Sequence, residues 1–302
     1  MIQRFKALGT VPVFLFALSM IFSGVATAED AFCTRDNLKS LANKYFDAIA
    51  AHDPSMLPLD PNVKFTENGK ELKVGEGIWK TAGKVLLTRH LIDTYKCGTH
   101  TQAVIEEKNA EGKNRPILFG VRLQYENEKI TEIETILARE TEFAMTMSPE
   151  GGANAVLNTK DQDWESILPI GERSSRLVLI AAADDYFEMF ADDPIFGTPF
   201  AEVCHRWENG YQTTKGGEFQ GKTYPPGKCT PKGLGLIMKH PPRRVPIVDV
   251  EAGTVVAYVH FASGLPDFHM FKMRNGKVEL IQSVIGSTSQ SMGWPIEPLC
   301  KD

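Results

Sequence analysis

Apolar residues recur at helical spacing in two separate stretches of the chain. One helix face is formed by Leu38, Leu41, Ala42, Tyr45, Phe46 and Ile49, and the same spacing returns in Leu179, Ala183, Tyr186, Phe187 and Phe190. A period near 3.6 residues predicts an amphipathic helix in each stretch. Both helices are expected to end near a proline, at Asp53-Pro54 and Asp193-Pro194.

The two stretches belong to a longer internal repeat. At an offset of 141, residues 44–47 match residues 185–188, and Glu67-Asn68-Gly69 matches Glu208-Asn209-Gly210. Asn-Gly is a strong hairpin signal because both residues tolerate positive φ. At an offset of 148, two β-rich stretches follow, and each copy ends in a hairpin, at residues 127–129 and 275–277. The pattern predicts an α+β fold, with one helix packed on a curved antiparallel sheet, encoded twice.

The repeat divides the chain into four expected parts. These are a signal peptide over residues 1–28, a first domain over 29–146, a linker over 147–173 and a second domain over 174–302. The linker is rich in Ser, Pro, Gly, Asn and Asp but contains Trp164, Ile167 and Leu168. We therefore expect it to dock partly against a domain.

The first 28 residues have the pattern of an export signal. Arg4 and Lys6 precede the apolar run Val11 to Phe22, and Ala26-Thr27-Ala28 is typical of a cleavage site. The run is shorter than the roughly 20 residues that span a bilayer. We expect a secreted or periplasmic protein with no membrane segment after cleavage. An uncleaved N-terminal anchor is the alternative.

Charge and cysteines narrow the possible functions. Cleavage leaves 31 basic and 38 acidic residues, a formal charge of −7, without the basic surface that nucleic acids require. Export permits disulfides, and we expect Cys204–Cys229 and Cys33–Cys97, which leaves Cys300 free or exchanging. The sequence has no Cys-x-x-Cys, nucleophile elbow, P-loop or dinucleotide fingerprint, so we expect no cofactor.

The order of elements resembles the cone-shaped fold of nuclear transport factor 2, ketosteroid isomerase and the SnoaL polyketide cyclases. More specifically, five segments resemble a family of secreted tandem SnoaL-like proteins of bacteria and fungi. These segments are residues 57–69, 75–82, 129–136, 208–214 and 244–249. The resemblance implies two tandem cone folds, each with a deep, mostly apolar pocket inside the curved sheet. In the cone-fold enzymes, one or two acid/base groups lie in that pocket.

The second copy has polar residues on otherwise apolar strands. Tyr258 and His260 share a strand face with Val256, and His269 follows Asp267 on the neighbouring strand. We predict a catalytic pocket holding Tyr258, His260, His269 and Asp267. In the alternative interpretation the histidines face solvent or bond within the sheet. His260, His269 and Asp267 also permit a metal triad, but their spacing is not diagnostic, and no metal site is predicted.

The first copy has Val121 at the position of His269 and offers other candidates. Arg122 in a cone would hold a carboxylate ligand, with Glu134 as a second ligand-binding residue. The alternative is a solvated cross-strand pair of Arg122 with a neighbouring glutamate. Glu67 and Glu208, at equivalent positions, are candidate ligand-binding acids. Their alternative role is to accept backbone hydrogen bonds in a turn that the fold requires.

These observations favour an exported enzyme that acts on a small molecule by cofactor-independent general acid/base catalysis, as an isomerase, dehydratase or lyase. A non-catalytic small-ligand-binding protein is the alternative. A third possibility is a purely structural role, with the two domains packed sheet to sheet as an internal pseudo-dimer. A homodimer is a further possible assembly.

Overall fold

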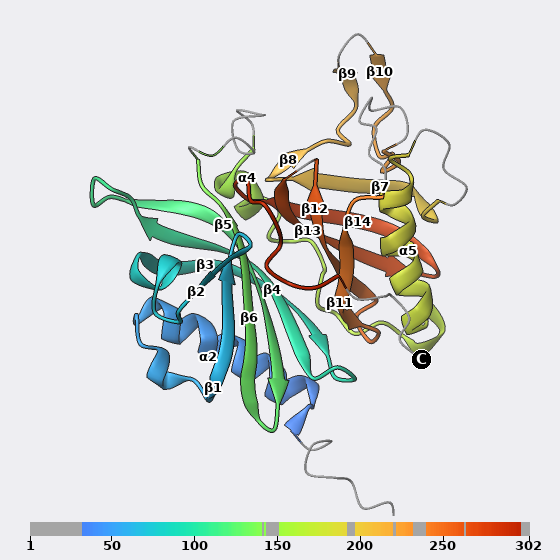
Figure 1. Ribbon diagram of the computed structural model, residues 1–302. Helices are drawn as coiled ribbons and strands as arrows, with labels where there is room; N and C mark the ends of the chain where they lie inside the picture. Colours follow the sequence, from blue (N-terminus) through green and yellow to red (C-terminus); the bar gives the residue numbers. More distant parts are fainter. Residues whose placement is uncertain are drawn as a thin grey trace, which may run out of the picture.

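The chain folds into two mixed six-stranded sheets, and each sheet is crossed by one helix (Figure 1). The computed structural model describes residues 32–140, 142, 151–191, 197–219, 222–231, 240–262 and 264–296. The predicted signal peptide and Cys300 lie outside these residues. Within them, no helix has the length and apolar character needed to cross a membrane.

The first half begins with the predicted amphipathic helix, α2. The Thr34 side chain accepts from the backbone N–H of Asn37, which caps the first turn. The buried side of α2 includes Tyr45 and Phe46, as its spacing predicted. The elements are α2 (Arg35–Ala50), η1 (Pro54–Met56), β1 (Leu59–Glu67), β2 (Lys70–Leu72), η2 (Gly77–Lys80), β3 (Ala82–Asp93), β4 (Gly98–Lys108), β5 (Asn114–Glu126) and β6 (Lys129–Ala138).

The second half repeats this order after a connecting segment. Ser175 caps α5 as Thr34 caps α2. The connection holds α4 (Ala153–Leu157) and η3 (Ile170–Glu172), and the second half holds α5 (Arg176–Glu188), β7 (Phe200–Glu208), β8 (Tyr211–Gln212), β9 (Gly217–Phe219), β10 (Lys222–Tyr224), β11 (Arg243–Asp249), β12 (Thr254–Phe261), β13 (Leu265–Arg274) and β14 (Lys277–Ile285). The short β9–β10 ribbon projects from the body (Figure 1).

The two sheets have the same topology. Their strand orders are β2-β1-β6-β5-β4-β3 and, read in the same direction, β8-β7-β14-β13-β12-β11. In each sheet the first long strand pairs parallel with the last, β1 with β6 and β7 with β14, while the other pairs are antiparallel. The predicted duplication of an α+β unit is therefore confirmed as two tandem cone folds.

The repeated Asn-Gly turns also have a second role. Asn68 and Asn209 adopt φ of 46° and 44° at the tips of the β1–β2 and β7–β8 hairpins. The Asn68 amide exchanges two hydrogen bonds with the backbone of Leu137, at 2.9 and 3.0 Å. Asn209 does the same with Ile285, at 2.8 and 3.1 Å. Each turn therefore fixes the register of the parallel pair beside it.

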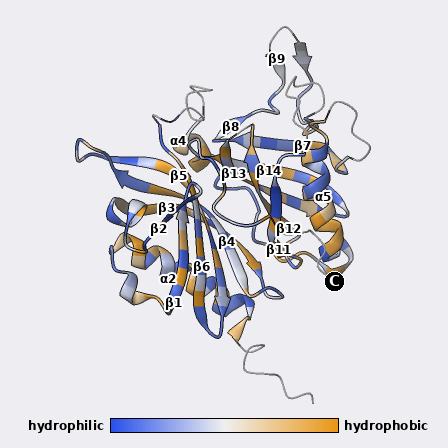
Figure 2. Cartoon of the chain, in the orientation of Figure 1, coloured by the Kyte–Doolittle hydropathy of each residue, from blue (hydrophilic) through white to orange (hydrophobic). Residues whose placement is uncertain are grey.

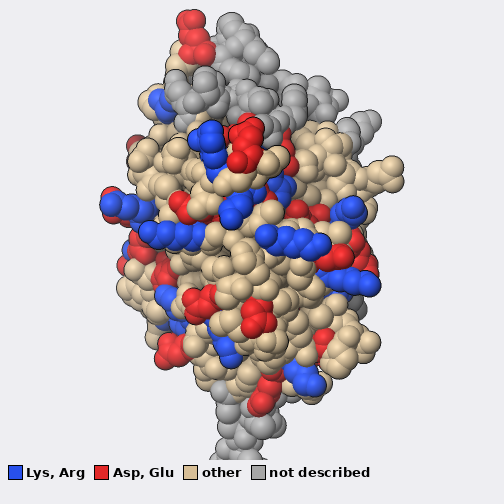
Figure 3. Space-filling model, turned by 90° about the vertical axis from the view of Figure 1, so that its left-hand side faces the viewer, with Lys and Arg blue, Asp and Glu red and all other residues tan. Residues whose placement is uncertain are grey.

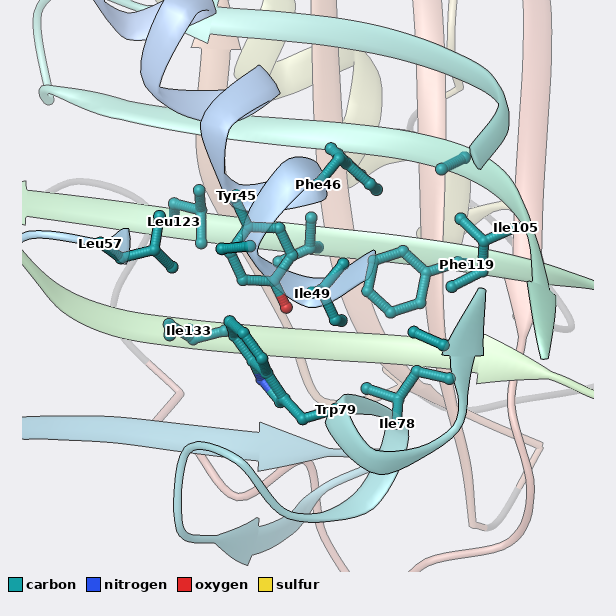
Figure 4. Close-up of a cluster of buried hydrophobic side chains, with 14 of the residues drawn as sticks. Tyr45, Phe46, Ile49, Leu57, Ile78, Trp79, Ile105, Phe119, Leu123 and Ile133 are labelled. Carbon is teal, nitrogen blue, oxygen red and sulfur yellow. The ribbon is translucent and has the colours of Figure 1, made fainter. Parts of the chain in front are cut away.

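Each helix packs on one face of its own sheet and encloses a core. The first core includes Tyr45, Trp79 and Phe119 (Figure 4), and the second includes Phe187 and Phe271. Along the strands, apolar and polar residues alternate, while α5 is apolar over much of its length (Figure 2). The predicted disulfides Cys33–Cys97 and Cys204–Cys229 are both present.

The opposite faces of the two sheets pack against each other. Apolar residues from both halves, among them Leu118, Ile136, Val256 and Phe268, form a third core between the sheets. Trp164 of the connecting segment is buried in this core, which confirms that the linker docks. The two sheets are therefore packed face to face. The domain bounds at residues 146 and 174 stay predictions.

Two buried aspartates join the halves in a reciprocal way. Asp93, at the end of β3, accepts from the backbone N–H of Val248 at 2.9 Å and pairs with both terminal nitrogens of Arg176 at 2.8 and 2.7 Å. Asp249, at the end of β11, accepts from the N–H of Ile92 at 2.9 Å and pairs with Arg35. Each carboxylate thus contacts the strand and the helix start of the other half. We call these four residues, Asp93, Arg176, Asp249 and Arg35, the reciprocal clasp.

Two histidines of the first half are buried on opposite faces of its sheet: His100 contacts Phe268 of the third core, and His90 lies 3.1 Å from Asn43 of α2. Burial lowers the pKa of His90 to about 4, with Glu165 opposing and Lys39 reinforcing the shift. Burial, with the charge of Arg122 and then His90, lowers the pKa of His100 to about 3. Both are therefore neutral in the folded protein at pH 7.

These histidines should make the protein acid-sensitive. Because the pKa of each histidine is lower in the folded state, the unfolded chain binds more protons below about pH 6.5. The free energy of unfolding is therefore unaffected by these histidines above about pH 6.5 and decreases as the pH falls towards 4 for His90 and 3 for His100. Each histidine should contribute up to about 1.4 kcal/mol per pH unit in that window. Urea unfolding at a series of pH values tests this, and His90→Gln should flatten the profile. Burial raises the pKa of Asp249 against the opposing charge of Arg35. Protonation of Asp249 therefore favours the folded state as the pH falls, which opposes the effect of the histidines.

Basic and acidic side chains are interspersed over the face shown in Figure 3. Such mixing of signs is typical of a solvated surface.

Candidate functional site

The four residues predicted to share one pocket lie on two opposite faces of the second sheet. In the β12–β13 register, Ala257 pairs with His269 and Tyr258 pairs with Phe268. Side chains of directly paired residues point to the same side of a sheet. His269 and Asp267 therefore point towards α5, and Tyr258 and His260 point towards the other half. The predicted juxtaposition is wrong, because a one-residue difference in register exchanges the two faces.

Tyr258 takes part in the contact between halves, and His260 contacts the C-terminal segment. The Tyr258 hydroxyl lies 2.9 Å from Nδ1 of His100, a residue of the first half. Nε2 of His260 lies 2.9 Å from the carbonyl oxygen of Ser289 in the C-terminal segment. Their positions match the alternative interpretation of strand histidines that bond locally.

Arg122 and Glu134 lie between the sheets and outside either cone interior. Arg122 Nε donates to Glu134 at 2.9 Å, and Nη1 pairs with Glu132 at 2.6 Å. The expected cross-strand pairing is present, but the Arg122 and Glu134 side chains are only 3% and 1% exposed, so the expected solvation is wrong. A ligand carboxylate inside the first cone would not meet Arg122.

The paired acids Glu67 and Glu208 have different surroundings. Glu67 accepts from the backbone N–H of Ile78 at 2.6 Å and lies 3.4 Å from Arg139, as a residue that holds a turn would. Glu208 instead forms an ion pair with Arg206, with 3.1 Å between Oε1 and Nε. The duplicated position therefore supports a turn in one half and a polar cluster in the other.

That polar cluster is the candidate site, and its centre is a buried acid–histidine pair on β13. Nδ1 of His269 lies 3.1 Å from Oδ2 of Asp267, and both side chains are at most 1% exposed. Both ring nitrogens of His269, both carboxylate oxygens of Asp267 and Oγ of Ser283 have no partner with hydrogen-bond geometry among the described residues, so the 3.1 Å contact is an ion-pair distance and not an aligned hydrogen bond. Ser283 pairs with His269 in the sheet and with Glu208 on the other side, so the three follow one row.

Helix α5 and strand β7 add a tyrosine and an arginine to the same interior. Arg206 Nη1 donates to the Tyr186 hydroxyl at 2.9 Å and to the carbonyl of Cys229 at 3.0 Å. The rings of Tyr186 and His269 lie 5.4 Å apart. Since Cys229 is joined to Cys204 on β7, the second disulfide holds the carbonyl that orients Arg206.

Burial determines the protonation tendencies in this cluster. It raises the pKa of Asp267, and the neighbouring His269 opposes the rise. It also raises the pKa of Tyr186 against the opposing charge of Arg206, so the phenol stays protonated. Burial alone would lower the pKa of Arg206, but Tyr186 and Glu208 outweigh it and raise the value.

The first half lacks this cluster because apolar side chains occupy the equivalent positions. Phe119 replaces Asp267 and Val121 replaces His269, by the offset of 148, while Phe65 replaces Arg206, by the offset of 141. All three are buried in the first core, and Figure 4 shows Tyr45, the counterpart of Tyr186, beside Trp79. The Tyr45 hydroxyl has no partner in the described part of the chain.

The sequence pattern did not mark Tyr186, Arg206 and Ser283 as functional residues. Tyr186 appeared only as part of an apolar helix face, and the other two were not considered. A comparison of the two copies could have found them, because a polar residue at an interior position of one copy is replaced by an apolar residue at the equivalent position of the other. Arg206 against Phe65 is the clearest case.

The described residues contain no group of three or more His, Cys, Asp or Glu side chains arranged to hold a metal ion. The donor set of this cluster is one imidazole, two carboxylates, a phenol, a serine and a guanidinium. That set suits proton transfer and hydrogen bonding to a substrate oxygen.

Several solved structures are similar to about a third of the chain. AclR, a proposed hydroxylase from Streptomyces galilaeus, is 12% identical over 36% of this chain and 92% of its own, with a TM-score of 0.29. An NTF2-like protein of unknown function from Cytophaga hutchinsonii is 11% identical over 33% and 98%, with a TM-score of 0.25. A proposed polyketide cyclase from Xanthomonas campestris pv. campestris is 14% identical over 34% and 90%, with a TM-score of 0.29.

Comparison with curated proteins gives no match. A family model described as "Domain of unknown function (DUF8021)" matches residues 32–137 and 172–285, which together make up most of the chain and correspond to the two cone folds. The chain therefore belongs to the DUF8021 family.

Proposed function

We propose that the interior of the second half is a cofactor-independent acid/base site for a small, partly apolar molecule. The observation that carries this proposal is the buried His269–Asp267 pair, whose four polar atoms, together with the Ser283 hydroxyl, lack hydrogen-bond partners among the described residues. Buried polar groups are almost always hydrogen-bonded, so such a group of orphans calls for a bound molecule or water.

In this proposal His269 transfers the proton. Oδ2 of Asp267 lies 3.1 Å from Nδ1, where its negative charge stabilises a protonated ring, and Nε2 is left for the substrate. A carboxylate behind an imidazole fixes its tautomer and stabilises the imidazolium that forms after proton abstraction. Asp267 is thus a positioning residue for His269.

Tyr186 is proposed to bind the substrate oxygen. A guanidinium has only donors, so in the contact with Arg206 the Tyr186 oxygen accepts, and its own hydrogen is free for another acceptor. The raised pKa keeps that hydrogen in place. A phenol polarised by a buried guanidinium is suited to stabilise negative charge that develops on a carbonyl oxygen.

The lining and the charge balance indicate the kind of substrate. Phe187, Phe261 and Phe271 have ring centroids 5.2, 6.1 and 6.1 Å from that of His269. The charge of Arg206 is balanced by Glu208. An apolar lining without a net positive charge favours a neutral carbonyl compound over a carboxylate.

The proposed reaction begins at the carbon next to the carbonyl. His269 removes a proton from that carbon, and the electron pair moves to the oxygen held by Tyr186. Return of the proton to a different carbon gives an isomerase, and loss of a leaving group from the neighbouring carbon gives a dehydratase or lyase. The first half serves as a scaffold. Two disulfides are typical of oxidising compartments, so we propose that the protein acts after export.

Solvent deuterium exchange tests the proposal without knowledge of the net reaction. The full mature chain is incubated in deuterated water with a panel of apolar ketones, and proton NMR follows exchange at the carbon next to the carbonyl. We expect exchange above the buffer rate for at least one member. Ligands that bind, as shown by calorimetry, but never exchange would overturn catalysis and leave a small-ligand-binding protein.

A further inference from the structure

The interior of the second half holds more free polar groups than a simple ketone would satisfy. His269 on β13 pairs with Ser283 on β14, and Ser283 pairs with Glu208 on β7, so the three side chains follow one row on the face towards α5. Neighbouring strands lie about 4.8 Å apart, so Ser283 is one strand spacing from each of the other two. In the proposed function Tyr186 binds the carbonyl oxygen and His269 meets the adjacent carbon, which leaves Ser283 without a role.

The Ser283 hydroxyl needs a partner that the described residues do not supply. The side chain is fully buried, and Oγ has no hydrogen-bond partner in the described part of the chain. An apolar group packed against this hydroxyl would leave it unsatisfied, which costs free energy. A bound molecule that fills this place therefore has to present a polar group to Ser283.

Glu208 lies at the more open end of the row. Its side chain is 30% exposed, and its ion pair with Nε of Arg206 uses Oε1, at 3.1 Å. The carboxylate has further lone pairs, so it can also accept from a group placed between Glu208 and Ser283. After burial, the charge of Glu208 also contributes to the raised pKa of Asp267, so this charge acts within the site. This end of the row therefore favours a group that donates a hydrogen bond.

The equivalent row of the first half is satisfied within the protein. Thr135 and Glu67 are the counterparts of Ser283 and Glu208 and form the same parallel strand pair. The Thr135 hydroxyl donates to the carbonyl oxygen of Thr66 at 2.9 Å, and Glu67 accepts from a backbone N–H at 2.6 Å. The fold itself therefore does not require a free hydroxyl at this position. The free hydroxyl occurs in the half that holds the candidate site.

We propose, on the basis of the proposed function, that the substrate is a β-hydroxy ketone whose hydroxyl group lies between Ser283 and Glu208. The Ser283 hydroxyl donates to the substrate hydroxyl, which in turn donates to Glu208. His269 has the Tyr186 ring on the helix side, with 5.4 Å between centroids, and Ser283 on the next strand. The carbon that His269 meets thus lies between the two substrate oxygens, which places the hydroxyl on the carbon β to the carbonyl.

Charged groups fit this place less well than a hydroxyl. A carboxylate would accept from Ser283 but would be repelled by Glu208. An ammonium group would add a second positive charge beside Arg206, whose own charge Glu208 already balances. Buried charges without a partner are costly, whereas a hydroxyl is neutral and both donates and accepts.

Calorimetry of the full mature chain with benzylacetone and its β-hydroxy derivative tests this proposal, because the two ketones differ only in the hydroxyl. The wild type should bind the hydroxy ketone at least about tenfold more tightly, since benzylacetone leaves Ser283 unpaired. Ser283→Ala should reduce this preference to about twofold or less, without loss of affinity for benzylacetone. Thr135→Val removes the counterpart hydroxyl in the first half and is the matched control, which should keep the wild-type preference.

Equal affinities of the wild type for the two ketones, no binding of the hydroxy ketone, or an unchanged preference in Ser283→Ala would overturn the proposal. A crystal structure of the wild type with the hydroxy ketone needs no variant. We expect the ligand hydroxyl within hydrogen-bond distance of Ser283 Oγ, and a water molecule there instead would contradict the assignment. Calorimetry measures binding alone, so a hydroxyl preference without deuterium exchange would reject catalysis and not the substrate class.

Discussion

Asp93→Ala is expected to destabilise the protein by about 3–5 kcal/mol, because removal of one partner leaves a buried charge uncompensated. Asp93 is 1% exposed and is bound to Arg176 by two hydrogen bonds and to the backbone N–H of Val248. The substitution leaves these buried donors of Arg176 and Val248 without their acceptor at the contact between halves. Urea unfolding followed by far-ultraviolet circular dichroism measures the change.

The reciprocal clasp offers its own controls. Glu251 also pairs with Arg35, but its side chain is 43% exposed, so Glu251→Ala should cost no more than about 1 kcal/mol. Asp93→Ala combined with Arg176→Leu should recover part of the loss, since no unpaired guanidinium remains. A loss below about 1 kcal/mol for Asp93→Ala alone would show that the clasp does not hold the halves together.

His269→Gln is expected to lower the rate of deuterium exchange by about 10²- to 10⁴-fold, the usual contribution of a positioned acid/base group. Glutamine has a similar size and no group that takes up a proton near neutral pH. Asp267→Asn should lower the rate less, because the imidazole remains but loses the carboxylate that orients it. Exchange rates at saturating ketone provide the measurement.

His260→Gln is the matched control for this prediction. His260 lies on the neighbouring strand but on the opposite face, where it contacts Ser289. The substitution should leave exchange unchanged, and circular dichroism should show that both variants are folded. Equal losses in the two variants, or undiminished exchange in His269→Gln, would remove His269 from the proposed mechanism.

The sequence alone was sufficient for the features that depend on local pattern or on the repeat. The 3.6-residue spacing around Tyr45 and Tyr186 located both helices, and the Asn-Gly pairs located the hairpin turns, because φ near +45° is easily adopted there. The offset between copies predicted two equal folds. Cys204–Cys229 was predicted because both cysteines lie in one repeat, with Cys33–Cys97 as the second pair, and both disulfides are present.

Only the tertiary structure decided which residues share a site. Alternation along β12 and β13 was readable, but the register between them was not, and it separates Tyr258 and His260 from His269 and Asp267. The reciprocal clasp and the Arg206–Tyr186 contact join residues far apart in the chain. Local sequence preferences do not predict these long-range contacts, because the contacts depend on how the two sheets and their helices pack.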